Sequence, residues 1–152
     1  MDKIIISDTS CLIALDNIGL LHIVKDLYRE IIITTEVKNE FGDSLPDWII
    51  VHDVKDKAKQ ADIENRLDKG EASSIALALE IPECLLIIDE LKGRNIAKSL
   101  NIEIIGTIGI LLLAHEKGIV TDVMSVIQRL VKSGFRLSDQ LLDRIKEKYR
   151  RI

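Results

Sequence analysis

Five short runs of branched aliphatic residues divide the chain and predict buried β-strands. They cover residues 4–6, 31–34, 48–51, 85–88 and 102–105, and the third is a candidate edge strand. The segments between them carry apolar residues at helical spacing, for example in residues 20–28, 72–79 and 123–130. Strands that alternate with helices predict an α/β fold: a three-layer α/β/α sandwich with a central, mostly parallel sheet.

The composition agrees with a single domain over residues 1–152. Apolar residues make up 47% of the chain but aromatic residues only 3%, so the core must be built from aliphatic side chains, as is typical of parallel sheets. A net charge of −4 argues against a broad basic surface for nucleic acid, although a local basic patch is compatible with it. Cys11 and Cys84 are interpreted as small buried thiols.

No apolar stretch is long enough to cross a bilayer, so no membrane association is expected. The amino terminus leads directly into a strand, without the sections of a signal peptide. We therefore expect a cytoplasmic protein.

Two of the predicted strands end on an acidic residue. Asp8 follows the first strand and Asp89 the fourth, where Glu90 comes next. Ser10 is expected to cap the helix that begins after Asp8. Ligands of open α/β sheets bind at the carboxyl ends of the strands, which lie along one edge, so Asp8 and Asp89 should converge there.

Further acidic residues lie on helices next to these strands. Glu36 and Glu40 share one face of a short helix that Thr35 could cap, and the spacing alone does not choose between them. Glu71 lies in the first turn of the helix over residues 70–79, where a negative charge is favourable in any case. Each could equally be an ordinary solvated acid.

Several carboxylates in one cleft repel one another unless a cation lies among them. A ligand set of oxygen atoms without cysteine or histidine favours Mg²⁺ or Mn²⁺. Such an ion suits the hydrolysis of phosphodiester bonds.

Five motifs, in this order, resemble the PIN domain family, in particular its small VapC-like ribonucleases and a small PIN-like branch of unassigned function. They are Ile6–Ser10, Val37–Phe41, Gly70–Ala72, Ile88–Arg94 and Ile105–Gly109, and they span nearly the whole chain. The resemblance favours Glu40 over Glu36.

The resemblance implies a metal-dependent endoribonuclease, a hydrolase of RNA that is the toxin of a toxin–antitoxin pair. The acidic quartet would be Asp8, Glu40, Glu71 and Asp89, of which Asp8, Glu71 and Asp89 would bind Mg²⁺ or Mn²⁺. Ser10 and Thr107 would support it as hydroxyls, and Lys92 and Arg94 are candidates for RNA phosphate contacts, with ion pairing to nearby acids as the alternative. A homodimer and a small antitoxin protein are implied as partners.

The chain departs from many PIN ribonucleases at two positions. Its third acid is Glu71 rather than an aspartate, and Glu90 could replace a ligand, support one or point to solvent. An alternative from another class is a catalytically inactive PIN-like module that binds a protein or RNA partner. A receiver domain or a haloacid-dehalogenase-like hydrolase would also begin with a strand that ends in aspartate, but Asp8 has no second acid two residues later and no acid pair before it.

Overall fold

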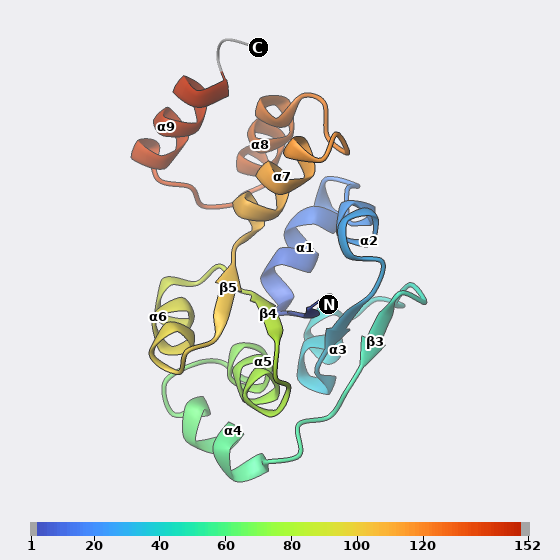
Figure 1. The fold of residues 1–152 in the computed structure, drawn as a ribbon, viewed down its shortest axis with the longest axis vertical. Coiled ribbons are helices and arrows are strands. Elements are labelled where there is room, and N and C mark those ends of the chain that lie inside the picture. The colour runs from blue at the N-terminus through green and yellow to red at the C-terminus, as the bar shows by residue number, and fades with distance from the viewer. Residues whose placement is uncertain (1–2, 150–152) are drawn as a thin grey trace.

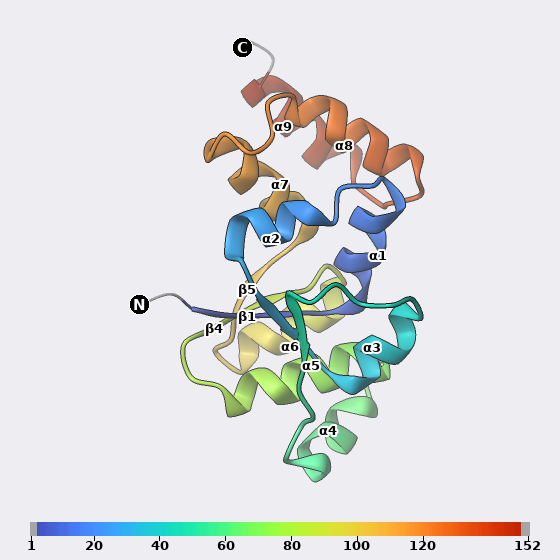
Figure 2. The same ribbon diagram turned by 90° about the vertical axis from the view of Figure 1, so that its right-hand side faces the viewer.

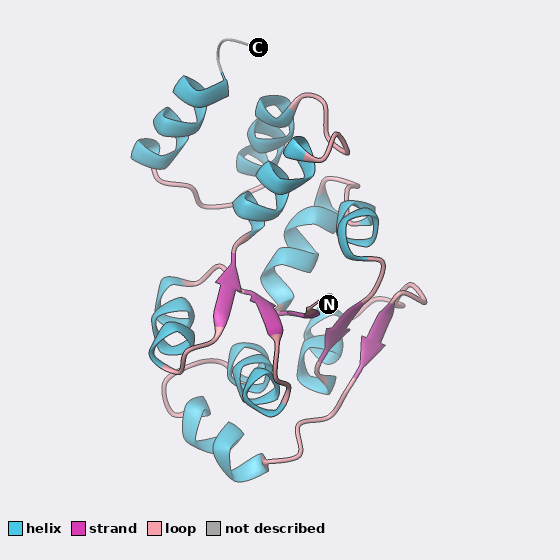
Figure 3. Cartoon of the chain, in the orientation of Figure 1, coloured by secondary structure: helices cyan, strands magenta, loops and turns pink. Residues whose placement is uncertain are grey.

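The computed structural model describes residues 3–149, in which a sheet of five parallel strands lies between layers of helices (Figure 1). The strands are β1 (Ile4–Ser7), β2 (Ile31–Ile33), β3 (Ile49–Val51), β4 (Cys84–Ile87) and β5 (Glu103–Ile105). Their order is β3-β2-β1-β4-β5, with β1 in the centre (Figure 3). The helices are α1 (Thr9–Asn17), α2 (His22–Tyr28), α3 (Thr35–Phe41), α4 (Lys57–Glu64), α5 (Lys69–Glu80), α6 (Leu91–Ser99), α7 (Thr107–Glu116), α8 (Val123–Lys132) and α9 (Asp139–Tyr149). The predicted three-layer α/β/α fold is confirmed.

Alternating residues of the strands build two separate cores. Ile5 and Ile87 pack with buried residues of α1, α2, α7, α8 and α9, whereas Ile6 and Leu86 pack with those of α4, α5 and α6. Successive side chains of a strand point to opposite faces, so a strand buried on both faces is apolar throughout. This explains why the strands appear in the sequence as unbroken aliphatic runs.

One helix connects the two layers at the carboxyl ends of the strands. Helix α3 contacts both α1 and α5, which lie on opposite faces of the sheet (Figure 2). Its buried residue Val37 packs into the first core. Residues near the end of α3 therefore lie close to the starts of α1 and α5.

Two helices begin one or two residues earlier than the sequence predicts. The N-cap of α1 is Asp8 rather than Ser10: the Asp8 backbone is extended and its N–H still donates to the Ile87 carbonyl at 2.9 Å, so the helix follows the strand without a loop. Thr34, rather than Thr35, caps α3, and its hydroxyl accepts a hydrogen bond from the Val37 N–H at 3.1 Å. The strand ladder thus leads directly into the helix at Asp8.

The last two features concern the cysteines and the character of the helices. Cys11 is buried and Cys84 half-buried, and neither forms a disulfide. Between residues 3 and 149 no helix has both the length and the apolar character that crossing a membrane requires.

Candidate active site

Asp8 provides a buried carboxylate at the carboxyl end of the central strand. Although Asp8 is the N-cap residue of α1, its side chain makes no capping hydrogen bond, and the residue is 4% exposed. The Ser10 hydroxyl, predicted to support the site, donates a hydrogen bond to Asp8 Oδ2 at 3.3 Å. The carboxylate is therefore available to a ligand rather than committed to the helix.

Glu40 is held between two other helices. Its Oε1 accepts a hydrogen bond from the Thr9 hydroxyl at 2.5 Å, and its Oε2 accepts one from the Gly70 N–H at 3.0 Å. A Cβ atom at Gly70 would lie 2.3 Å from Glu40 Oε1, so any larger residue at this position would displace the Glu40 carboxylate. Glu36 instead contacts the side chain of Gln60, so of the two glutamates it is Glu40 that lies beside the first turn of α1.

Glu71 lies in the first turn of α5 next to an acid that the motifs did not include. Asp68 is the N-cap of α5 and its Oδ1 accepts a hydrogen bond from the Glu71 N–H at 2.8 Å. Glu71 is 6% exposed, and its Oε2 is a buried atom without a hydrogen-bond partner among the described residues. An acid three residues before a glutamate at the start of an apolar helix is the signal that could have identified Asp68.

Asp89 is engaged by the start of α7. Its two carboxylate oxygens accept hydrogen bonds from the N–H of Thr107 at 2.7 Å and from the Thr107 hydroxyl at 2.6 Å. A carboxylate at the N-terminus of a helix is also favoured by the helix dipole. The structure thus brings together Asp89 and Thr107, two residues that the sequence assigned to one site.

Five acidic side chains line one cavity of about 270 Å³, together with Thr9, Ser10 and Ile13; they are Asp8, Glu40, Asp68, Glu71 and Glu90. A neighbouring cavity of about 460 Å³ shares Asp68, Glu71 and Glu90 and has Lys92 in its wall. We call these two together the acidic cavity. Asp89 and Arg94 instead line a third cavity, so the sequence neighbours Asp89 and Glu90 contribute to different cavities.

Burial, with a smaller effect of neighbouring charges, raises the pKa values of the two most buried acids of the acidic cavity. Burial raises the pKa of Asp8 to about 7, with smaller contributions from the charges of Asp68 and Glu40, while a hydrogen bond from the Thr9 backbone acts against the shift. Burial and the neighbouring Asp68 carboxyl raise the pKa of Glu71 to about 8, and the charge of Asp8 adds to the effect. Both carboxylates are thus disfavoured in their charged form and would gain from a nearby cation.

The donor set fits a hard divalent cation. All its members are carboxylate oxygens, the ligands of Mg²⁺ and Mn²⁺, and the partnerless Oε2 of Glu71 is a buried acceptor to which such an ion could bind. Among residues 3–149, no three acidic, histidine or cysteine side chains already form a complete metal site. Binding would therefore require side chains of the acidic cavity to move toward the ion.

A parallel α/β sheet whose carboxyl edge carries an acid-lined cavity is typical of the class of open α/β proteins, whose ligands bind at that edge. Within this class, the family model described as PIN domain matches residues 4–151, and the chain belongs to the PIN domain family. This confirms the resemblance drawn from the motifs; the fold is of the nuclease type, and PIN domains typically use divalent metal ions. Neither the curated proteins nor the solved structures include a significant match to the chain.

Proposed function

We propose that this protein is a metal-dependent endoribonuclease that hydrolyses RNA phosphodiester bonds with Mg²⁺ or Mn²⁺. The observation that carries the proposal is the buried, partnerless Oε2 of Glu71 in a cavity shared with Asp8. A module that only binds a partner has no physical reason to place such groups together, because the repulsion among them destabilises the fold.

Asp8 and Glu71 would hold the ion. Of the remaining acids, Glu90 and Asp68 line the same cavity, whereas both oxygens of Asp89 already accept hydrogen bonds from Thr107. Asp89 stays a predicted ligand, and Glu90 is the stronger candidate on position. The ion, when bound, would supply a positive charge beside the scissile phosphate and lower the pKa of the attacking water.

The remaining side chains would position the reactants. Glu40, held by hydrogen bonds from Thr9 and Gly70, would accept a hydrogen bond from the attacking water. Lys92 lies at the rim of the acidic cavity and could bind an RNA phosphate. Ser10 would keep Asp8 oriented through the hydrogen bond to Oδ2.

The role as the toxin of a toxin–antitoxin pair, the homodimer and the small antitoxin are supported by family membership alone. Expression with and without an inducible neighbouring gene product, followed by growth, would test the toxin role. Sedimentation of the purified protein would test the dimer.

The decisive experiment is cleavage of a mixed pool of structured and single-stranded RNAs. Three proteins should be compared: the wild type, Asp8→Asn and Asp43→Asn. The last is the matched control, because it changes an exposed carboxylate in a loop. Each protein is assayed with Mg²⁺, with Mn²⁺ and with EDTA. We expect metal-dependent cleavage by the wild type and by Asp43→Asn, and none by Asp8→Asn. Metal-dependent cleavage that Asp8→Asn retains would refute the assignment.

One observation favours the second candidate, a non-catalytic PIN-like module: residues 3–149 contain no complete group of metal ligands. A Mn²⁺ titration followed by calorimetry separates the two functions. Saturable binding that Glu71→Gln weakens supports the nuclease, whereas no binding to the folded protein supports the module.

A further inference from the structure

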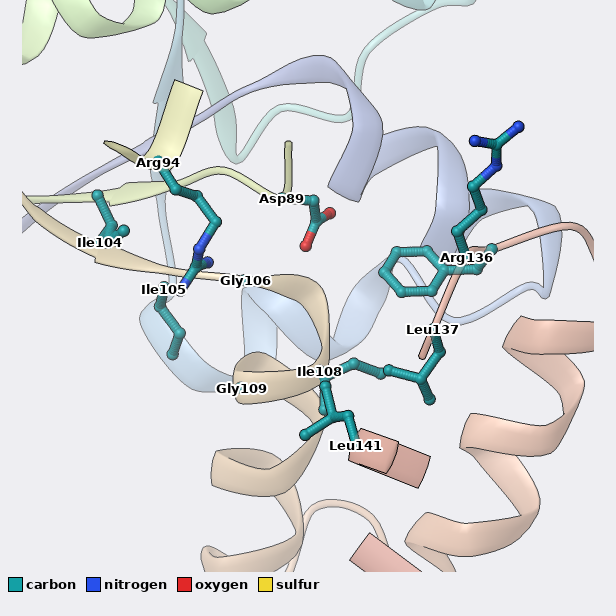
Figure 4. A pocket seen from close by; sticks show the side chains of 11 residues that line it. Asp89, Arg94, Ile104, Ile105, Gly106, Ile108, Gly109, Arg136, Leu137 and Leu141 are labelled. Atoms are coloured by element: carbon teal, nitrogen blue, oxygen red, sulfur yellow. The ribbon is translucent and has the colours of Figure 1, made fainter. Parts of the chain in front are cut away.

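A further cavity, of about 480 Å³, has Asp89 in its lining (Figure 4), whereas the next residue, Glu90, lines the acidic cavity. One wall comes from the β5–α7 junction, including Gly106 and Ile108, and the opposite wall from the segment between α8 and α9 with the start of α9. We call it the side pocket. Of the residues that line it, only Asp89 and Arg94 have been given a role above.

The side pocket combines an apolar floor with one aromatic ring. In Figure 4 the side chains of Ile108, Leu137 and Leu141 lie close together, and Phe135 is also part of the lining. Phe135 and Leu137 are half-buried, and Leu141 is exposed. A volume of this size is within the range of small-ligand sites, which are mostly apolar with a few polar groups.

The unpaired charges of the side pocket are positive. Arg94 uses Nη1 to donate to the Ile88 carbonyl at 2.9 Å, and Arg136 is exposed, with its guanidinium directed away from the apolar floor (Figure 4). Over residues 3–149, neither arginine forms an ion pair with a carboxylate. The one acid in the lining, Asp89, accepts two hydrogen bonds from Thr107, and the two arginines leave the pocket with a net positive charge. The occupant should therefore present a flat apolar face and a negative charge.

The wall beside Asp89 is thin because Gly106 has no side chain. A Cβ atom at Gly106 would lie 3.0 Å from both Arg94 Nη1 and Asp89 Oδ1. A larger residue at Gly106 would require the Arg94 guanidinium or the Asp89 carboxylate to shift and would take up space between them. The glycine therefore lets a ligand approach Arg94 and Asp89 along the backbone.

We propose that the side pocket binds one unpaired base of the RNA substrate, next to the nucleotide whose phosphate enters the acidic cavity. Unpaired RNA bases stack on aromatic rings and on arginine guanidinium planes, and the adjoining phosphates bind cations. Phe135 would stack on the base, Arg136 would contact it or its phosphate, and Arg94 would face its polar edge. The inference rests on the proposed function and extends it, because the pocket would determine which nucleotide is preferred beside the cut.

The test uses two variants that keep the fold and one control. Phe135→Leu removes the ring while keeping an apolar side chain, and Arg136→Gln removes an exposed charge. Arg144→Gln removes an exposed arginine of α9 that is not part of the lining. Each of the four nucleoside 5′-monophosphates is titrated into ¹⁵N-labelled protein with Mg²⁺ present, and the amides of Gly106, Gly109 and Leu141 are followed.

We expect saturable shifts of these amides with at least one nucleotide. Phe135→Leu and Arg136→Gln should weaken the binding about ten-fold, as the loss of one stacking or charge contact does, and Arg144→Gln should leave it unchanged. The inference would be overturned if no nucleotide shifted these amide signals. It would also be overturned if neither Phe135→Leu nor Arg136→Gln lowered the nucleotide affinity. A protein partner would then be the better occupant of this surface.

The same variants separate this inference from the proposed function. Nucleotide binding in the side pocket without RNA cleavage under any metal condition would support the pocket and refute the nuclease. Cleavage by Phe135→Leu and Arg136→Gln with the wild-type KM and the wild-type pattern of cut sites would support the nuclease and refute the pocket.

Discussion

Replacing Asp8 by asparagine should make the metal-free protein more stable while removing its activity. Asp8 is buried and lines a cavity of about 270 Å³ with four other acids, and none of the described residues that line this cavity is a cation. Asparagine has nearly the same shape, keeps an oxygen to accept the hydrogen bond from the Thr9 backbone and can donate to Ser10. The substitution therefore removes a destabilising charge with little loss of contacts.

The size of the effect follows from the pKa of Asp8, which is raised from an ordinary 3.8 to about 7. At about 1.4 kcal/mol per pH unit, ionisation of Asp8 at pH 8 lowers the free energy of unfolding by at most about 4 kcal/mol. Because the remaining acids rearrange around the charge, we expect a net gain of about 2 kcal/mol from Asp8→Asn. That corresponds to a rise in Tm of about 4–8 °C for a chain of this length.

The gain should depend on pH. A carboxyl whose pKa is raised by folding stabilises the protein below the unfolded value near 4, and this contribution is lost as the pH rises through about 7. At pH 5 most of the folded protein carries a protonated Asp8, so the difference between variant and wild type should be smaller than at pH 8.

Urea unfolding in EDTA at pH 5 and pH 8, followed by circular dichroism, measures this difference. Asp43→Asn is the control, since it removes an exposed carboxylate with the same chemical change and should alter the free energy of unfolding by less than about 0.5 kcal/mol. Destabilisation by Asp8→Asn at pH 8, or a gain that is equal at both pH values, would refute the electrostatic reasoning.

Three further predictions concern the acidic residues of the candidate site. In a thermal melt, saturating Mn²⁺ should raise the Tm of the wild type but not that of Glu71→Gln, because the buried Glu71 Oε2 is the expected ligand. Equal Tm shifts in both proteins would exclude Glu71 as a ligand. Gly70→Ala should displace the Glu40 carboxylate, because Oε1 would lie 2.3 Å from the new Cβ atom. The protein should still fold, and its cleavage rate should fall about ten-fold or more. A wild-type rate would show that the position of Glu40 does not matter for cleavage. Asp89→Asn should lower the free energy of unfolding by about 1–2 kcal/mol, because it weakens the hydrogen bonds with Thr107. Glu90→Gln should instead lower the Mn²⁺ affinity measured by calorimetry. If Asp89→Asn lowers the Mn²⁺ affinity and Glu90→Gln lowers only the stability, Asp89 is the ligand.

Most of the fold could be predicted from the sequence because both faces of the sheet are covered. Strands such as Ile4–Ser7 and Ile31–Ile33 are apolar on both sides, so no other element fits these short branched runs. The exact starts of α1 and α3 could not be predicted. The start of α1 depends on a tertiary hydrogen bond from the Asp8 N–H to the Ile87 carbonyl of β4, which the local pattern does not reveal. At α3 the adjacent Thr34 and Thr35 are equally good caps by residue type, and only the structure shows that the Thr34 hydroxyl accepts the hydrogen bond from the Val37 N–H.

The candidate site was predicted in part. The positions of Asp8, Glu40 and Glu71 near one edge follow from the order of strands and helices, and the structure places all three in the acidic cavity. Asp68 was missed because an aspartate before a helix is fully explained as an N-cap. The separation of Asp89 from Glu90 could not be inferred either, since it depends on which of two adjacent side chains points toward α7 and which toward α5.

The two hydrogen bonds of Glu40 have a consequence for how relatives of this chain should be compared. Glu40 connects α3 to α1 through Thr9 and to α5 through Gly70, so it contributes to the folded state whether or not any chemistry takes place. Asp8 makes the opposite contribution, because its charge opposes folding unless a cation neutralises it. A lineage that abandons catalysis would therefore tend to lose Asp8 first and keep Glu40 long afterwards. Retention of Asp8 is thus the more informative sign that natural selection still maintains an active enzyme.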